Sequence, residues 1–79
     1  MKTIGIINGE RVRLHIPERR SVEGPVPTAT LFFGERRVAL DEHSLPERVR
    51  RTIPVPIVKA TLEDWEPFLV QVHLHQLWR

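Results

Sequence analysis

The feature that most constrains this chain is a pair of short stretches in which apolar and polar residues alternate around a glycine-containing turn. In the first stretch, the alternating apolar residues on the two sides of Asn8-Gly9 are Ile4, Ile6, Val12, Leu14 and Ile16. In the second, Leu31 and Phe33 precede Gly34-Glu35, and Val38 and Leu40 follow it. A period of two is typical of a strand with one buried face. The sequence therefore predicts two β-hairpins, the second with glycine at the first position of a type II′ turn.

The register of the first hairpin depends on the length of its loop. A two-residue loop pairs Ile6 with Arg11, which mixes apolar and charged side chains on one face. A three-residue loop or a bulge instead pairs Ile6 with Val12 and Ile4 with Leu14. We expect the second register, because a slip of one residue moves every side chain to the other face of the sheet.

Prolines and a capping pattern define the segments around the second hairpin. Residues 17–27 contain three prolines and are expected to form an exposed loop. A short helix is predicted at 45–52. The Ser44 side chain can accept a hydrogen bond from the Glu47 N–H, and the Glu47 side chain can accept one from the Ser44 N–H. Pro54 is expected to end this helix.

The last two segments are predicted as strands, one of them with an alternative. Val55 and Ile57 lie in the proline-containing stretch 54–62. We expect an edge strand here, because a proline has no backbone N–H to donate to a neighbouring strand. In 65–78, apolar residues alternate over eight positions, which favours a strand. The alternative for 65–78 is an amphipathic helix capped at Asp64, with Pro67 in its first turn.

Together these elements predict an α+β fold that is mostly β, a small antiparallel sheet of hairpins with one short helix at 45–52. Under the alternative, the segment 65–78 is helical as well. Residues 1–79 are expected to form a single domain, because a chain this short buries too little surface for two cores. The expected core consists of Ile4, Ile6, Val12, Leu14, Leu31, Phe33, Val38, Leu40, Val49, Ile57, Val70, Val72 and Leu74.

The amino-acid composition indicates where in the cell the protein is found and how its fold can be stabilised. The chain has no cysteine, so it has neither disulfides nor thiolate metal sites and must hold by packing or with a partner subunit. It shows neither a signal-peptide pattern nor a membrane-length apolar run, so we expect a cytoplasmic protein without a membrane partner. Arginine outnumbers lysine by ten to two and thermolabile residues are few, a composition typical of a thermophilic source.

Arginines in close pairs make nucleic acid a candidate partner. The sequence pI is about 9.9, although the formal net charge is only +2, because few groups lose protons just above pH 7. The candidate nucleic-acid-binding residues are Arg11, Arg13, Arg19, Arg20, Arg36 and Arg37, since guanidinium groups match phosphate oxygens. The competing interpretation is a solvated surface in which neighbouring glutamates pair with these arginines.

Two histidines form a weaker candidate site. His73 and His75 are two residues apart, so on a strand both rings project from one face and can share a metal ion. On a helix they diverge, and the metal hypothesis fails. The simpler interpretation is a solvated strand face. No nucleophile with a matching base and no phosphate-binding glycine loop is present, so we predict no enzyme activity, no catalytic residues and no cofactor.

The tryptophans suggest a surface for association, because Trp78 lies one residue from the chain end, where an uncovered ring is unfavourable. The expected interface residues are Trp65, Trp78, Leu77, Val55 and Ile57. The first functional hypothesis is a non-catalytic protein-interaction or homo-oligomeric assembly module, whose partner is another protein or a second copy. The alternative is a small nucleic-acid-binding protein that uses the paired arginines on phosphates.

Overall fold

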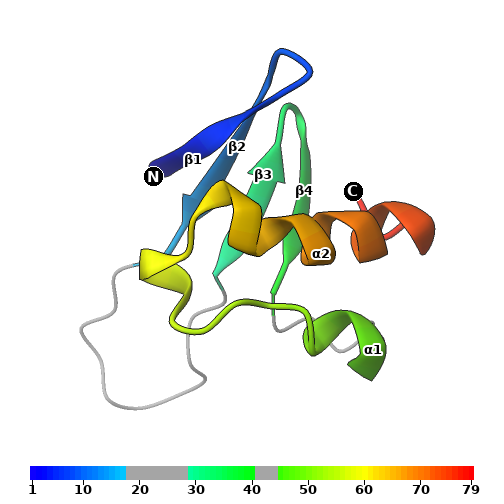
Figure 1. The fold of residues 1–79 in the computed structure, drawn as a ribbon. Coiled ribbons are helices and arrows are strands. Elements are labelled where there is room, and N and C mark those ends of the chain that lie inside the picture. The colour runs from blue at the N-terminus through cyan, green and yellow to red at the C-terminus, as the bar shows by residue number, and fades with distance from the viewer. Residues whose placement is uncertain (18–28, 41–44) are drawn as a thin grey trace.

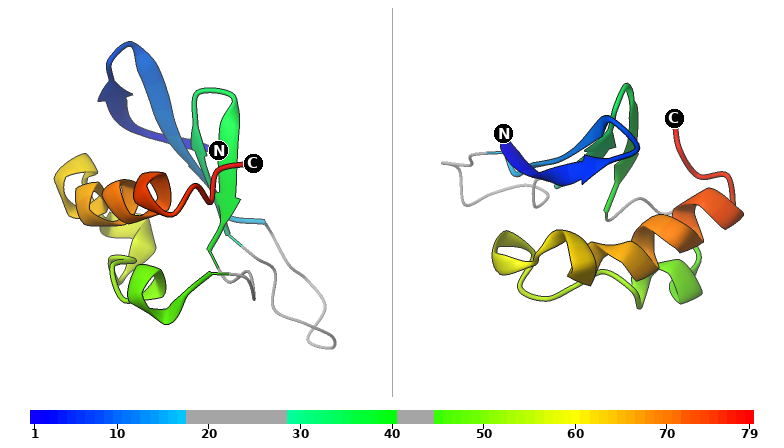
Figure 2. Two further views of the ribbon diagram at one scale, coloured as in Figure 1. Left: turned by 90° about the vertical axis from the view of Figure 1, so that its right-hand side faces the viewer. Right: turned by 45° about the horizontal axis from the view of Figure 1, so that its top comes forward.

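The chain forms a four-stranded antiparallel sheet with helices packed on one face (Figures 1 and 2). The computed structural model describes residues 1–17, 29–40 and 45–79. Its elements are β1 (Lys2–Ile7), β2 (Glu10–His15), β3 (Thr30–Phe33), β4 (Arg36–Ala39), α1 (Glu47–Arg50), the 3-10 helix η1 (Ile57–Lys59) and α2 (Leu62–Leu74). The sheet order is β1-β2-β3-β4. The predicted α+β class and the sheet of hairpins are therefore confirmed.

The first hairpin has the register that we did not expect. Asn8-Gly9 has φ angles of 51° and 81°, as a two-residue type I′ turn requires, and Ile6 pairs with Arg11. A bulge before Gly5 then brings this glycine opposite Val12. The expected pairing of Ile6 with Val12 is wrong because the turn residues fix the loop length, and the Ile6 side chain is exposed.

The second hairpin follows the predicted pattern. Gly34 has a φ of 61°, the positive value that the first position of a type II′ turn needs. Leu31 pairs with Val38, and Phe33 pairs with Arg36. Because β2 also pairs with β3, Leu14 lies opposite Leu31, and the apolar faces of both hairpins form one surface.

The predicted short helix is present as α1, although it covers fewer residues than 45–52. Its N-cap is Pro46, which makes no side-chain capping hydrogen bond, and Ser44 lies outside the described residues. Val49 is the buried residue of α1 and anchors it to the core.

The stretch 54–62 is not an edge strand, so that prediction is wrong. It contains η1, a single 3-10 turn, and the residues around Pro54 and Pro56 are turns and bends. Prolines lack the N–H that a strand needs for its ladder, and two of them in three residues leave too few donors for pairing. Ile57 instead packs against the core from η1.

The segment 65–78 is largely helical, so the strand prediction is wrong and the helical alternative is correct. Thr61, rather than Asp64, is the N-cap of α2, and the two residues form a reciprocal capping box. The Thr61 N–H donates to Asp64 Oδ2 over 2.9 Å, and the Asp64 N–H donates to Thr61 Oγ1 over 3.3 Å. Pro67 lies in the second turn of the helix. The buried residues of α2 are Trp65, Phe68, Leu69 and Val72.

The core lies between the sheet and the helices. Its buried members are Val12, Leu14, Leu31, Val38, Leu40, Leu45, Val49, Trp65, Phe68, Leu69 and Val72. Trp65 and Phe68 meet edge to face, with ring centroids 5.6 Å apart. Ile6, Val70 and Leu74, which we expected in this core, are exposed instead. The last two are exposed because the helix turns them away from the buried stripe.

The C-terminal residues fold back onto the sheet. The Arg79 N–H donates to the Arg37 carbonyl over 2.9 Å, and the Arg37 N–H donates to the main-chain oxygen of Arg79 over 3.2 Å. The Trp78 ring lies 5.7 Å from the Phe33 ring, centroid to centroid. The tail thus pairs with the outer edge of β4, an edge that would otherwise present unpaired backbone groups.

Candidate nucleic-acid interface

The second face of the sheet is not covered by the described helices, which both lie on the opposite side (Figure 2). Successive side chains of a strand point to opposite faces, so the neighbours of the buried strand residues point outward. We call this surface the open face; it consists of Thr3, Ile6, Arg11, Arg13, His15, Thr30, Phe32, Arg37 and Ala39.

One row of the open face crosses all four strands. Arg13 lies between Thr3 and Phe32, and Phe32 lies between Arg13 and Arg37. Neighbouring strands are about 4.8 Å apart, so the backbones of Arg13 and Arg37 are about 10 Å apart. Arg11 lies two positions before Arg13 on β2, about 7 Å away. Three arginines therefore share the face of the sheet that carries Phe32.

The centre of this row is a stacked pair. The Arg13 guanidinium carbon lies 5.5 Å from the Phe32 ring centroid, within the range of a cation–π contact. The Arg13 Nε is buried and has no hydrogen-bond acceptor among the described residues. The pair places a positive charge beside an aromatic ring on this face, and both aromatic rings and guanidinium planes can stack on nucleobases.

Among the described residues, acidic side chains are confined to the helix side of the sheet and to its turns. The open face carries three arginines and no described acidic side chain. The described acidic residues are Glu10, Glu35, Glu47, Glu63, Asp64 and Glu66. Four of them belong to the helices, Glu35 is in the second hairpin turn, and Glu10 faces Arg36. The sequence suggested that glutamates neutralise these arginines, but no described acidic side chain pairs with Arg11, Arg13 or Arg37.

Two of the predicted arginine pairs contribute differently from our expectation. Arg36 points to the helix side of the sheet, where its guanidinium carbon lies 5.0 Å from the Phe33 ring centroid and 5.9 Å from that of Trp78. Its Nη2 donates to Glu10 Oε2 over 3.5 Å. Arg36 thus belongs to the packing around the tail and not to the open face. Arg19 and Arg20 lie outside the described residues.

The predicted association surface does not assemble as expected. Trp65 is completely buried in the core, so its assignment to an interface is wrong. Leu77 and Trp78 pack partly against the core, and Ile57 does the same from η1. Val55 is exposed, but it lies in a turn and not on a sheet edge.

The histidine pair does not form a metal site. His73 belongs to α2, and His75 is its C-cap, so the two rings diverge around the helix axis. No cluster of three metal-ligating side chains occurs among the described residues. The metal hypothesis based on His73 and His75 is therefore wrong, because it required a strand.

Sequence reasoning missed Phe32 as a functional candidate. The signal was present, because Phe32 lies between Leu31 and Phe33, which alternate toward the core. In a strand, a residue between two inward residues must point outward. An aromatic side chain at such a position on an inner strand is what an exposed stacking platform requires.

The described residues contain no helix that is long and apolar enough to cross a membrane. Comparison of the chain with models of protein families, with curated proteins and with solved structures finds no match.

Proposed function

We propose that this protein binds single-stranded nucleic acid on the open face of its sheet. The observation that carries the proposal is that Arg11, Arg13 and Arg37 share this face with Phe32, while no described acidic side chain lies on it. Arginines neutralise phosphates, and an aromatic ring between them stacks on a base. A cytoplasmic location, expected from the sequence, is part of this proposal.

A single strand fits this surface better than a duplex does. The platform of Arg13 and Phe32 can be used only by a base whose plane is accessible, and in a duplex the base planes are stacked inside. Among the described residues, no helix or β-ribbon protrudes from this face to enter a groove of a duplex. Recognition is therefore expected to depend weakly on base sequence, because every base has a stacking surface.

Fluorescence anisotropy with labelled oligothymidylate and oligouridylate of about 12 nucleotides tests the proposal. Three phosphate contacts predict that log K falls with log salt concentration with a slope of about −2. Replacing one contacting arginine, as in Arg11→Gln or Arg37→Gln, is expected to reduce the steepness of this slope by about 0.7. Phe32→Leu is expected to weaken binding by about 1–3 kcal/mol and to leave the slope unchanged, since stacking releases no counterions.

Arg50→Gln is the matched control, because Arg50 is exposed on α1 in the helix layer. It removes the same charge from the protein without touching the open face. Absence of binding at low salt, or equal weakening by Arg50→Gln and Arg37→Gln, would refute the proposal. Equal affinity for a duplex of the same length would refute the stacking platform.

The protein-interaction or assembly module is a second proposal, and a specific feature of α2 favours it. The surface that we first expected for it, with Trp65 at its centre, is excluded because this residue is buried. A different surface, on the exposed side of α2, carries the argument that follows.

A further inference from the structure

The exposed side of α2 carries apolar residues that nothing in the described structure covers. Val70 is 53% exposed and Leu74 is 67% exposed. Together with Glu66 they are spaced four residues apart, so they form one ridge along the helix. The buried stripe of Trp65, Phe68, Leu69 and Val72 is the other side, so this ridge is a second apolar surface and not part of the core.

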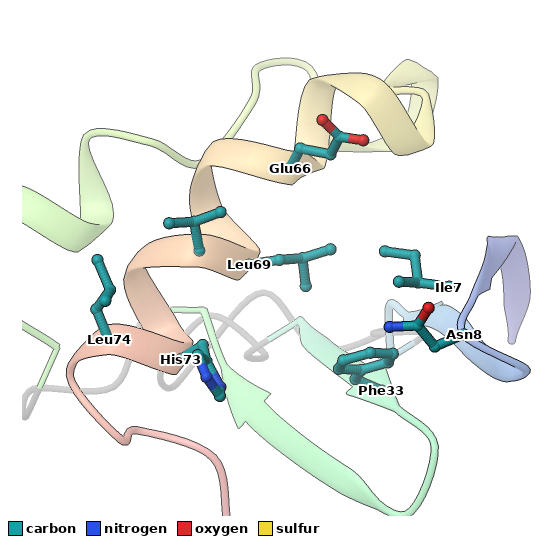
Figure 3. Close-up of a pocket in the computed structure, with 8 residues that line it drawn as sticks. Ile7, Asn8, Phe33, Glu66, Leu69, His73 and Leu74 are labelled. Carbon is teal, nitrogen blue, oxygen red and sulfur yellow. The ribbon is translucent and has the colours of Figure 1, made fainter.

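A groove runs beside this ridge, between α2 and the end of the first hairpin (Figure 3). Its volume is about 450 Å³, and most of its lining is apolar, contributed by Ile7, Phe33, Leu69, Val70 and Leu74. In Figure 3, Ile7 and Leu69 face each other across the groove, whereas Leu74 lies farther along the helix. The molecule thus places an apolar ridge and an apolar groove next to each other.

The polar side chains along α2 have the order that an antiparallel pairing of two copies of this helix requires. Glu63, Asp64 and Glu66 lie in its first half, and His73 and His75 lie at its end. Glu66 and His73 both line the groove. When two such helices run in opposite directions, the carboxylate of one faces the imidazole of the other twice. A parallel pairing would instead place the two carboxylates together.

We propose that a second copy of this chain docks on the exposed side of α2 to form a twofold-symmetric dimer with antiparallel helices. The ridge of Glu66, Val70 and Leu74 of each copy packs against the same ridge and its adjacent groove on the other. With the twofold axis between Leu69 and Val70, Glu66 of each copy lies opposite His73 of the other, and all four residues line the groove. This inference is independent of the proposed nucleic-acid binding, because it uses the helix layer.

The dimer is tested by sedimentation velocity over a wide range of protein concentration, on samples freed of nucleic acid. We expect a monomer–dimer equilibrium. Val70→Gln and Leu74→Gln are each expected to raise the dissociation constant about tenfold or more, because symmetry removes two buried side chains per substitution. The matched control is Val55→Gln, since Val55 is 89% exposed in a turn and does not line the groove. This control is expected to leave the equilibrium unchanged.

An exchange of charges tests the direction of the helices. Glu66→Lys places a lysine opposite the imidazole, and His73→Glu places two carboxylates together, so each is expected to weaken the dimer. The double variant Glu66→Lys/His73→Glu restores opposite charges and is expected to recover the dimer. Circular dichroism and thermal melting show that each variant is folded. A monomer at every concentration, a dimer insensitive to Val70→Gln, or no recovery in the double variant would overturn the inference.

Discussion

Removal of the Trp78 ring is the perturbation that most directly tests how the C-terminal tail belongs to this fold. The ring packs against Phe33, with centroids 5.7 Å apart, and under the Arg36 guanidinium. Burial of roughly 100 Å² of the ring is worth about 2.5 kcal/mol. The aromatic pair and the cation–π contact add about 1 kcal/mol between them. Trp78→Ala is therefore expected to lower the free energy of unfolding by about 3 kcal/mol.

A loss of this size is expected to lower the melting temperature by about 10–25 °C for a chain of this length. Thermal and urea unfolding followed by circular dichroism measure it. Trp78→Phe retains an aromatic ring against Phe33 and is expected to lose about 1 kcal/mol. His75→Ala is the control, because this side chain is exposed beside the same tail. If Trp78→Ala melted at the wild-type temperature, the tail would not be packed on the sheet, and the ring would again be available to a partner.

Three further changes probe the local structure. Thr61→Ala removes the N-cap acceptor of α2 and is expected to lose about 1 kcal/mol in urea unfolding, and an unchanged midpoint would contradict the capping box. A Cβ on Gly5 would lie 2.7 Å from Leu62 Cδ2, so Gly5→Val is expected to lose about 1–3 kcal/mol in the same assay, with Ile6→Val as a neutral control. Phe68→Ala is expected to lose about 3–5 kcal/mol, so that little cooperative melting transition survives.

The hairpins could be predicted from the sequence, but their registers required turn geometry. Alternation around the glycine turns identified β1 to β4, because a period of two leaves few other structures for such short stretches. Alternation alone did not locate the bulge before Gly5. That bulge depends on two constraints from different parts of the chain, the type I′ turn at Asn8-Gly9 and the approach of Leu62 from α2.

The C-terminal helix was misread because its sequence satisfies two periods at once. The apolar residues 68, 70, 72 and 74 alternate as in a strand, yet 65, 68, 69 and 72 have helical spacing. The deciding signal is local: Thr61 and Asp64 form a capping box directly before the apolar run. Val70 and Leu74 are the residues that the strand prediction needed in the core and that the helix leaves exposed.

The sequence predicts only part of the candidate site, because the rest depends on the register between strands. The sequence correctly places Arg11 and Arg13 on one strand face, because they are two residues apart on β2. The addition of Arg37 and the separation of Arg36 depend on the register between β3 and β4, where one residue decides the side of the sheet. Two arginines that are adjacent in a strand point to opposite faces of the sheet. An adjacent pair such as Arg36 and Arg37 therefore contributes only one charge to the open face.

The two proposed surfaces lie on opposite layers, and this arrangement makes their combination testable. A dimer through α2 is expected to leave both open faces accessible, because in each copy the helices lie on the side of the sheet opposite the open face (Figure 2). A strand long enough to reach both faces is then bound twice and gains affinity from effective concentration, whereas a short strand gains nothing. Val70→Gln is expected to remove the advantage of long strands and to leave the affinity for short ones unchanged. Equal affinity for long and short strands in the wild-type dimer would mean that the two faces cannot be used by one strand.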